Sequence, residues 1–210
     1  MRFAVIGAGG HSKEVADLVA ACGHDVSGFV DEGYTGAHPT TGLPVVADAN
    51  ALEFDAVVFA IGDNRARSEW YESLSGRIHA PALIHPTAVI SPSASLGEAV
   101  QAMQCVVVNA GARIGNDCIL NVSCSIAHDC VVGAHTHLAP GARMGGGSSV
   151  GPGSLVGTNA TIMPGVSVGR GCTVGAGAVV SHDLADGITA VGVPARPLVA
   201  GASEGARTFD

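Results

Sequence analysis

Residues 115–132 read GNDCIL-NVSCSI-AHDCVV, and this stretch decides the fold of the second half of the chain. Each six-residue segment ends in a large aliphatic residue, at Leu120, Ile126 and Val132, with a cysteine two positions earlier. Three such segments make about eighteen residues, the length of one turn of a triangular coil in which each hexad supplies a short strand and a corner. The stretch therefore predicts one complete turn of a parallel β-helix.

The same register extends in both directions without a slip. An apolar residue stands at every sixth position from Ile84 to Val180, which makes seventeen hexads, and the residue two positions earlier is always small or β-branched. We expect the large side chains to fill the interior and the small ones to fit where the triangle narrows. Glycine or asparagine, such as Asn109 and Asn121, is expected to take the unusual backbone angles at the corners. The predicted domain is a left-handed parallel β-helix of hexapeptide repeats over residues 81–200, with five to six turns, followed by a tail at 201–210.

The repeat also accounts for most of the cysteines. Cys118, Cys124, Cys130 and Cys172 all fall in the small, inward-facing register, and the chain has no CxxC pair. We therefore predict that these four pack in the interior and neither bind a metal nor react.

Composition excludes several classes of protein. The 210 residues include 30 glycines, 47% are hydrophobic and only 13% are charged, which argues against a disordered chain. The formal net charge of −8 argues against nucleic-acid binding. No apolar run is long enough to span a membrane, and the apolar start of the chain is too short for a secretion signal. The expectation is a cytoplasmic protein with reduced cysteines.

Residues 1–80 follow a different pattern. A short apolar run at 3–6 predicts a buried strand, a glycine turn follows it, and apolar residues at helical spacing predict a helix over 12–22 that Gly23 ends. Further strands are predicted at 28–31 and 56–62. Strands that alternate with helices indicate a small Rossmann-like α/β domain.

The glycine turn suggests a nucleotide site. A turn between a strand and a helix presents backbone N–H groups to a phosphate, and Asp31, about twenty residues on, suits a ribose hydroxyl. Ser12 stands where the third glycine of a dinucleotide motif belongs, and the domain is short for a dinucleotide. A mononucleotide or its sugar derivative is the better interpretation; a tight turn without a ligand is the alternative.

Taken together, the two halves resemble a known family. Its landmarks run along almost the whole chain: Gly9-Gly10-His11, Phe29-Val30-Asp31, Ala60-Ile61-Gly62-Asp63-Asn64-Arg65, Ala127-His128-Asp129-Cys130, His137-Leu138-Ala139-Pro140-Gly141 and Val191-Gly192-Val193-Pro194-Ala195-Arg196. With these motifs the chain resembles the hexapeptide-repeat sugar acyltransferases typified by bacillosamine N-acetyltransferase and the sialic acid O-acetyltransferase group.

The resemblance implies a set of site residues. It makes His128 the general base, with Asp129 beside it to hold the imidazole, although relatives often carry the longer Glu at that position. It also implies a homotrimer with acetyl-coenzyme A bound along the coil between two subunits, and no metal. The residues implied for acetyl-coenzyme A are His137, Gly146, Ala176 and Arg196, and those for a nucleotide-linked sugar are Gly9, Gly10, His11, Ser12, Asp31, Gly62, Asn64 and Arg65.

Elementary chemistry agrees with the role of His128. Moving an acetyl group from a thioester to an amine or hydroxyl requires the acceptor to lose a proton, and imidazole accepts protons near neutral pH. His137 lies half a turn further on, so the two histidines should point to different sides of one coil and could meet across a trimer interface. The glycines at 145–147 are the expected place for a backbone N–H that stabilises the oxyanion. His135 and His182 are interpreted as solvated surface residues.

The uninterrupted repeat leaves no long loop on the coil to hold an acceptor, which directs the acceptor to the N-terminal domain. The leading prediction is an acetyl-coenzyme A-dependent N-acetyltransferase for a nucleotide-linked amino sugar, such as a 4-amino-4,6-dideoxy sugar for surface glycans. O-acetylation of a sialic acid uses the same base and remains open. Zinc hydratases share the coil, but their histidine spacing is not found at residues 128–137. A non-catalytic binding coil and a nicotinamide-dependent reductase are two further hypotheses.

Overall fold

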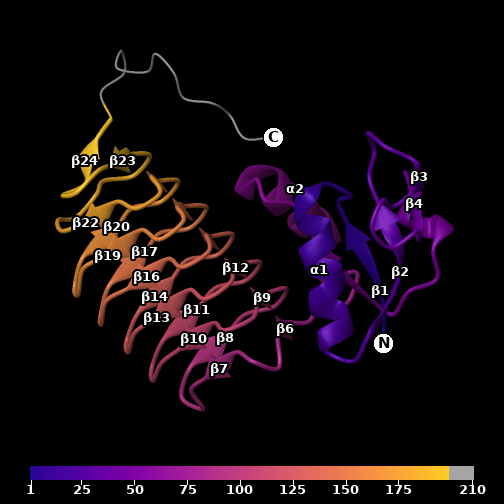
Figure 1. The fold of residues 1–210 in the computed structure, drawn as a ribbon, viewed down its shortest axis with the longest axis horizontal. Coiled ribbons are helices and arrows are strands. Elements are labelled where there is room, and N and C mark those ends of the chain that lie inside the picture. The colour runs from indigo at the N-terminus through magenta and orange to yellow at the C-terminus, as the bar shows by residue number, and fades with distance from the viewer. Residues whose placement is uncertain (199–210) are drawn as a thin grey trace.

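The structure is a computed structural model, and it describes residues 1–198. A small α/β unit is followed by a three-sided coil that rises beside it, with α1 and α2 lying near the coil (Figure 1). The predicted tail at 201–210 lies outside the described residues, as do the last two residues assigned to the coil domain. Neither described helix has the length and apolar character needed to cross a membrane.

The N-terminal unit is built on a five-stranded sheet with the order β3-β4-β2-β1-β5. Strands β4, β2, β1 and β5 run parallel, and β3 is antiparallel to β4. Both faces of β1 are buried, which explains why its sequence is an apolar run without alternation. In chain order the elements are β1 (Arg2–Ile6), α1 (Gly10–Ala21), β2 (Asp25–Val30), β3 (Gly36–Ala37), β4 (Pro44–Val46), the short 3-10 helix η1 (Ala49–Ala51), β5 (Ala56–Phe59) and α2 (Asn64–Leu74).

The first helix is close to its prediction but begins earlier. It starts at Gly10, two residues before the predicted start, because Gly9 adopts extended angles and serves as the N-cap. Gly23, with φ +76°, follows the end of the helix as predicted. The strand predicted at 56–62 ends at Phe59, so Gly62 lies in the loop before α2.

The coil has three walls of stacked parallel strands and winds as the predicted left-handed β-helix. The first wall contains β7 (Val89–Ile90), β10 (Val107–Val108), β13 (Ser125–Ile126), β16 (Arg143–Met144), β19 (Thr161–Ile162) and β22 (Val179–Val180). The second contains β8 (Ser95–Leu96), β11 (Arg113–Ile114), β14 (Val131–Val132), β17 (Ser149–Val150) and β20 (Ser167–Val168). The third contains β6 (Leu83–Ile84), β9 (Gln101–Ala102), β12 (Ile119–Leu120), β15 (His137–Leu138), β18 (Leu155–Val156), β21 (Thr173–Val174), β23 (Thr189–Val191) and β24 (Arg196–Pro197), of which only β24 pairs antiparallel.

The predicted hexad register is confirmed strand by strand. From β6 to β22, the second residue of every strand is the apolar residue of one hexad, and it is large in every strand except β9, which has Ala102. Paired residues lie eighteen positions apart, as in Ile119 with His137 and Leu120 with Leu138. The interior is full along most of the coil, but Ile84 is 39% exposed because no turn lies beneath the first one.

The residues that adopt left-handed backbone angles at the corners differ from those predicted. The left-handed residues recur every sixth position, for example Asp117, Asp129 and His135, and this series does not include Asn109 or Asn121. The glycines that follow the large aliphatic residues are needed for another reason. A Cβ atom on Gly133 would lie 2.5 Å from the backbone nitrogen of Pro152 in the next turn, so only glycine fits there.

Two hydrophobic clusters hold the molecule together. One joins the α1 side of the sheet to the coil interior, and the other lies between the sheet and α2. The four cysteines predicted to be inward are buried in the first cluster. Burial raises the pKa of the Cys118 and Cys124 thiols to about 12, so both remain protonated and unreactive near neutral pH.

Candidate active site

His128 lies on the corner that follows β13, with 69% of its side chain exposed. Its Nδ1 is 2.8 Å from Oδ2 of Asp129, so the shorter carboxylate does reach the imidazole. Asp129 manages this from a left-handed backbone with φ +60°, a conformation that aspartate tolerates better than most residues. Because a carboxylate can only accept, Nδ1 carries the hydrogen of this contact, which leaves Nε2 as the ring nitrogen that can accept a proton.

Two glycines make room for this pair. A Cβ atom on Gly146, eighteen residues after His128, would lie 2.5 Å from Nε2 of the imidazole. A Cβ atom on Gly111, eighteen residues before Asp129, would lie 2.6 Å from Oδ1 of the carboxylate. The imidazole therefore lies against the Cα of the next turn and the carboxylate against that of the previous turn.

The three glycines at 145–147 are not equivalent. The N–H of Gly145 donates to the carbonyl oxygen of Ile162, and the N–H of Gly147 donates to that of His128. Within residues 1–198, this leaves the N–H of Gly146 as the candidate donor to an oxyanion. It belongs to the residue that contacts the His128 ring.

His137 lies on β15 of the third wall, whereas His128 follows a strand of the first wall, so one subunit does not bring the two histidines together. Nε2 of His137 is 3.2 Å from Nδ2 of Asn121, a residue with 5% exposure. Burial, with a further contribution from the charge of Arg67, lowers the pKa of His137 to about 4. His137 is therefore neutral at physiological pH.

The side chain of His11 approaches His137 from α1. The two ring centroids are 6.4 Å apart, and Nδ1 of His11 is 3.1 Å from Oε2 of Glu14. The hydrogen bond from His11 lowers the pKa of Glu14. Nε2 of His11 is buried and has no hydrogen-bond partner among the described residues. The structure thus places His11, predicted for the sugar nucleotide, beside His137, predicted for acetyl-coenzyme A.

The glycine turn is open to solvent at its tip. Gly9 and Gly10 are exposed, no atom would contact a Cβ on either one, and α1 has no side-chain cap at its N-terminus. Asp31 supports the turn from the end of β2, since its carboxylate accepts from the N–H of Ala8 at 3.0 Å and of Gly33 at 2.9 Å. An uncapped helix N-terminus of this kind favours an anion.

Ser12 does not line this opening. Its side chain is completely buried, and its hydroxyl contacts the carbonyl oxygen of Gly9 and lies 3.0 Å from Nε2 of His38. The His38 ring stacks on Phe29 with centroids 3.8 Å apart. Ser12 therefore supports the glycine turn from its buried side. This position does not fit the prediction that Ser12 contacts the ligand.

The loop between β5 and α2 faces the coil. Nδ2 of Asn64 donates to the carbonyl oxygens of Gly153 and Ser154, at 3.2 and 2.9 Å, so this residue, which is predicted to contact the ligand, also joins the two units. Arg65 is 88% exposed and pairs with Glu69 at 3.0 Å. Gly62, Asn64 and Arg65 line a cavity of about 240 Å³ against the third wall.

Sequence reasoning missed the strongest contact between the two units. Arg67 is completely buried, and its guanidinium donates to the carbonyl oxygens of Ile61 and His135, to Oδ1 of Asn64 and to Asp117. His135 belongs to the same network through Nδ1, 2.9 Å from Oδ2 of Asp117, so the prediction of a solvated His135 is wrong. Nothing in the local sequence distinguishes Arg67 from the exposed Arg65.

The remaining predicted residues lie higher on the coil. Ala176 is exposed on the corner after β21, and Arg196 is exposed on β24, where its guanidinium donates to the carbonyl oxygen of Ala195 at 3.0 Å. Residues 1–198 contain no group of three or more side chains placed to hold a metal ion.

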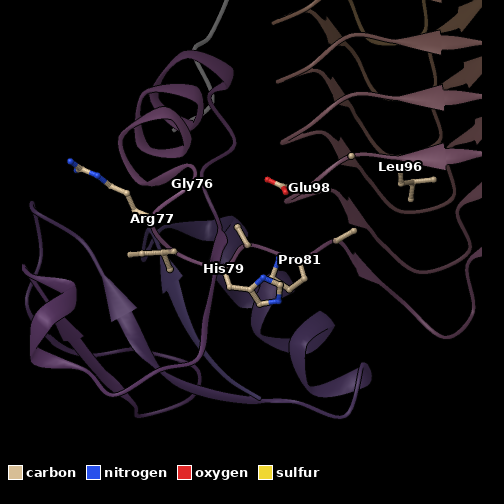
Figure 2. A pocket seen from close by; sticks show the side chains of 10 residues that line it. Gly76, Arg77, His79, Pro81, Leu96 and Glu98 are labelled. Carbon is tan, nitrogen blue, oxygen red and sulfur yellow. The ribbon is translucent and has the colours of Figure 1, made fainter.

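A cavity of about 470 Å³ lies elsewhere (Figure 2). It is enclosed by the segment 76–82, which links α2 to the coil, and by 96–98 of the first turn. Glu98 points into the space between the two units, whereas Arg77 points away from it. None of the predicted site residues lines this cavity.

Two protein families match the chain, one for each unit. Residues 2–74 match the family described as PglD N-terminal domain, and residues 111–146 and 147–182 match the six-repeat bacterial transferase hexapeptide family. No curated protein sequence matches the chain at the significance threshold.

Solved structures match along nearly the whole chain. A histidine-to-asparagine variant of perosamine N-acetyltransferase from Caulobacter crescentus, in complex with CoA and GDP-perosamine, is 40% identical with a TM-score of 0.89, and the match covers 94% of this chain and 97% of that one. The acetyltransferase domain of PglB from Neisseria gonorrhoeae, in complex with acetyl coenzyme A, is 37% identical with a TM-score of 0.89 and coverages of 94% and 98%. WeeI from Acinetobacter baumannii is 29% identical with a TM-score of 0.85 and coverages of 94% and 100%.

Proposed function

Because the chain belongs to the family of hexapeptide-repeat sugar acetyltransferases with a PglD-type N-terminal domain, we propose that it transfers the acetyl group of acetyl-coenzyme A to the amine of a nucleotide-linked sugar. The observation that carries the proposal is the His128–Asp129 pair, held at 2.8 Å through Nδ1 on an exposed coil corner, which leaves Nε2 as the proton acceptor. The relatives crystallised with coenzyme A and with GDP-perosamine support both substrates.

In the proposed reaction, the sugar amine attacks the thioester carbonyl carbon while Nε2 of His128 takes a proton from the amine. The bond between carbon and sulfur then breaks, and the imidazolium returns its proton to the departing coenzyme A thiolate. Asp129 stabilises the imidazolium and fixes the ring through Nδ1. The N–H of Gly146 is the proposed donor to the oxyanion, because its two neighbours already donate elsewhere.

The acceptor is held by its nucleotide. The diphosphate would lie at the uncapped start of α1, against the backbone of Gly9 and Gly10, with Asp31 supporting the turn. Binding the nucleotide in the N-terminal unit orients the reacting amine, which is how binding energy remote from the reaction accelerates it. His11 and His137, whose ring centroids are 6.4 Å apart, lie where α1 meets the third wall of the coil.

We propose a trimer in which each active site is shared. His128 is 69% exposed, so within the described part of a single chain its ring lacks walls on the solvent side. A neighbouring coil would supply those walls and would bring its own His137 towards His128. Acetyl-coenzyme A would lie in the same interface, against Gly146, Ala176 and Arg196.

The test is turnover with a panel of acceptors. The wild-type chain is incubated with acetyl-coenzyme A and UDP-, GDP- or dTDP-linked amino sugars, and thiol release is measured. His128→Ala should lower kcat by about two orders of magnitude or more, the usual effect of a lost general base, while the exposed His182→Ala should not. Near-normal turnover of the His128 variant, or thiol release only with free or CMP-linked sialic acid, would contradict the proposal.

A further inference from the structure

The peptide bond between Gly145 and Gly146 is held from inside the coil. The carbonyl oxygen of Gly145 accepts from the thiol of Cys130 at 3.1 Å and from the N–H of Ser148 at 3.2 Å. Cys130 is completely buried, so this carbonyl points into the coil. The bond is trans, and in a trans peptide the C=O and the N–H point in opposite directions. The N–H of Gly146 therefore points out of the coil, on the corner that carries His128.

The thiol of Cys130 belongs to a short chain of hydrogen bonds in the interior. Because the carbonyl oxygen of Gly145 can only accept, the single hydrogen of the thiol lies on this contact. The hydroxyl of Ser148 lies 3.6 Å from the same sulfur and is left as the donor to it. Hydrogen bonds that run in one direction along such a chain polarise one another. A polarised Gly145 carbonyl makes the N–H of the same peptide, on Gly146, a stronger donor.

The contact occurs once on the corner between the first and second walls, two residues after the candidate base. In the described part of the chain, four other residues hold the register of Cys130 on this corner. Ala94, Ala112 and Val166 have no side-chain donor, and the hydroxyl of Ser148 contacts only the sulfur. Because the corner packs with alanine at this register, the thiol of Cys130 is not needed to fill the interior.

The corner between the second and third walls contains an occupied version of the same arrangement. There the buried hydroxyl of Ser154 donates to the carbonyl oxygen of Gly169 at 2.8 Å, and donor and acceptor lie fifteen residues apart, as in the first contact. The N–H of the same peptide, on Arg170, donates to Oδ1 of Asp186 at 2.9 Å. A corner carbonyl held by a buried side chain thus directs the N–H of its peptide to a negatively charged oxygen.

We propose that Cys130 is a positioning residue for acetyl transfer, whose buried thiol fixes and polarises the Gly145–Gly146 peptide so that the N–H of Gly146 meets the oxyanion of the tetrahedral intermediate. The inference rests on the proposed function, which assigns the oxyanion to this N–H. The thiol takes no part in making or breaking bonds. It stabilises the charged intermediate more than the bound thioester, so its effect belongs to kcat rather than to KM.

Replacing the thiol tests this role, with turnover measured on acetyl-coenzyme A and the nucleotide-linked amino sugar that the wild-type chain accepts. Cys130→Ala removes the donor, and kcat should fall on the order of fivefold to tenfold, a fraction of the roughly hundredfold loss that follows removal of an oxyanion donor itself. KM for both substrates should change by less than about twofold. Cys130→Ser should restore most of kcat, because a serine hydroxyl makes the equivalent contact at Ser154.

Cys118→Ala is the matched control. Cys118 is also completely buried, and its thiol donates to the carbonyl oxygen of Gly133 at the same distance of 3.1 Å, but on the corner between the second and third walls. The alanine variants of Cys118 and Cys130 should lower the urea midpoint by similar amounts, and only the Cys130 variant should lose kcat. The pH profile of kcat should keep its shape in Cys130→Ala, because the proposed role leaves His128 unchanged.

The outcomes separate this inference from the proposed function. Equal kcat in the two alanine variants, a raised KM with unchanged kcat, or no recovery in Cys130→Ser would each overturn the role of Cys130 and leave acetyl transfer in place. A shifted acid limb of the pH profile would assign the effect to His128 and would overturn that role as well. A wild-type chain that acetylates no nucleotide-linked sugar would overturn the proposed function, and the role of Cys130 with it.

Discussion

At the residue scale, the geometry of the candidate base depends on two glycines, whose lack of a side chain leaves room for His128 and Asp129. The imidazole of His128 lies against Gly146 and the carboxylate of Asp129 against Gly111, each one turn away along the coil. Any side chain at those two glycines would occupy the space of the functional groups. The repeat thus determines where the base can lie as well as where the chain turns.

Replacing Gly146 by alanine tests this arrangement. The new Cβ would lie 2.5 Å from Nε2 of His128, so the ring must move, and we expect kcat to fall roughly tenfold to a hundredfold. The backbone itself accommodates alanine, because Gly146 does not have a positive φ, so the urea midpoint should change little.

Gly147→Ala is the matched control. Gly147 has φ +67°, and no atom lies within 4 Å of the place that a Cβ would take there. Alanine at this position should therefore cost about 1 kcal/mol of stability through backbone strain and spare the ring. The two variants should separate activity from stability. Full kcat in Gly146→Ala would show that His128 does not need its observed position.

Single residues also show where sequence reasoning succeeds and where it stops. The His128–Asp129 contact on a coil corner could be predicted because a motif and the hexad register agree on it, while the role of His128 as base stays a prediction. His135 has the same residue type and a similar corner, yet it is held by Asp117, a contact made eighteen residues away. Arg67 and Asp117 together could not be predicted, since their pairing depends on how two separately folding patterns pack against each other.

At the element scale, the coil was predictable because a period of six leaves a signal at every position from Ile84 to Val180. The backbone angles at the corners were less predictable. Asn109 and Asn121 have the expected residue type, but the left-handed residues lie at another position of the hexad. Asn121 instead contacts His137. Residue type alone does not give the position of a residue within a turn.

The buried contact between Arg67 of α2 and Asp117 of the coil gives a prediction about stability. Arg67→Met removes the charged partner of the buried Asp117 and leaves its carboxylate with only the hydrogen bond from His135, so we expect the free energy of unfolding to fall by about 3–5 kcal/mol. Arg65→Met on the same helix removes only an exposed pair and should cost about 0.5 kcal/mol or less. Urea unfolding of both variants makes the comparison; equal losses would refute the role of the buried network.

At the scale of the whole molecule, His137 makes stability depend on pH. Its pKa is about 4 in the folded chain against an ordinary value of 6.5, so below pH 6.5 the unfolded chain binds a proton that the folded chain does not. Folding stability due to this group is therefore intact above pH 6.5 and declines as the pH falls towards 4, by at most about 1.4 kcal/mol per pH unit.

Urea unfolding at several pH values between 4 and 7 measures this effect. His137→Asn should flatten the dependence relative to wild type, because the group that resists protonation is gone. His182→Asn, at an exposed position, should follow the wild-type curve. If His137→Asn kept the wild-type slope, other groups would be responsible for the loss of stability in acid.

The shared active site can be tested by mixing inactive subunits. If His128 of one subunit works with His137 of its neighbour, then trimers assembled from His128→Ala and His137→Ala chains contain some interfaces with both histidines. Random assembly would restore about a quarter of the sites. Separate variants should be nearly inactive, and light scattering should report a trimer in each case. No recovery in mixed trimers, or an active monomer, would exclude a shared site.

The constant spacing of eighteen residues between paired strands limits how such a molecule can change in length. The N-terminal unit donates hydrogen bonds to the carbonyl oxygens of Asp117, His135 and Gly153, which lie on successive turns of one edge of the coil. His128 lies within the same turns. An insertion of a few residues that continued the coil there would rotate every later wall. The coil corners that contact the N-terminal unit would then no longer keep their positions relative to His128. A whole extra turn added above Val180 would leave both the contacts with the N-terminal unit and His128 in place.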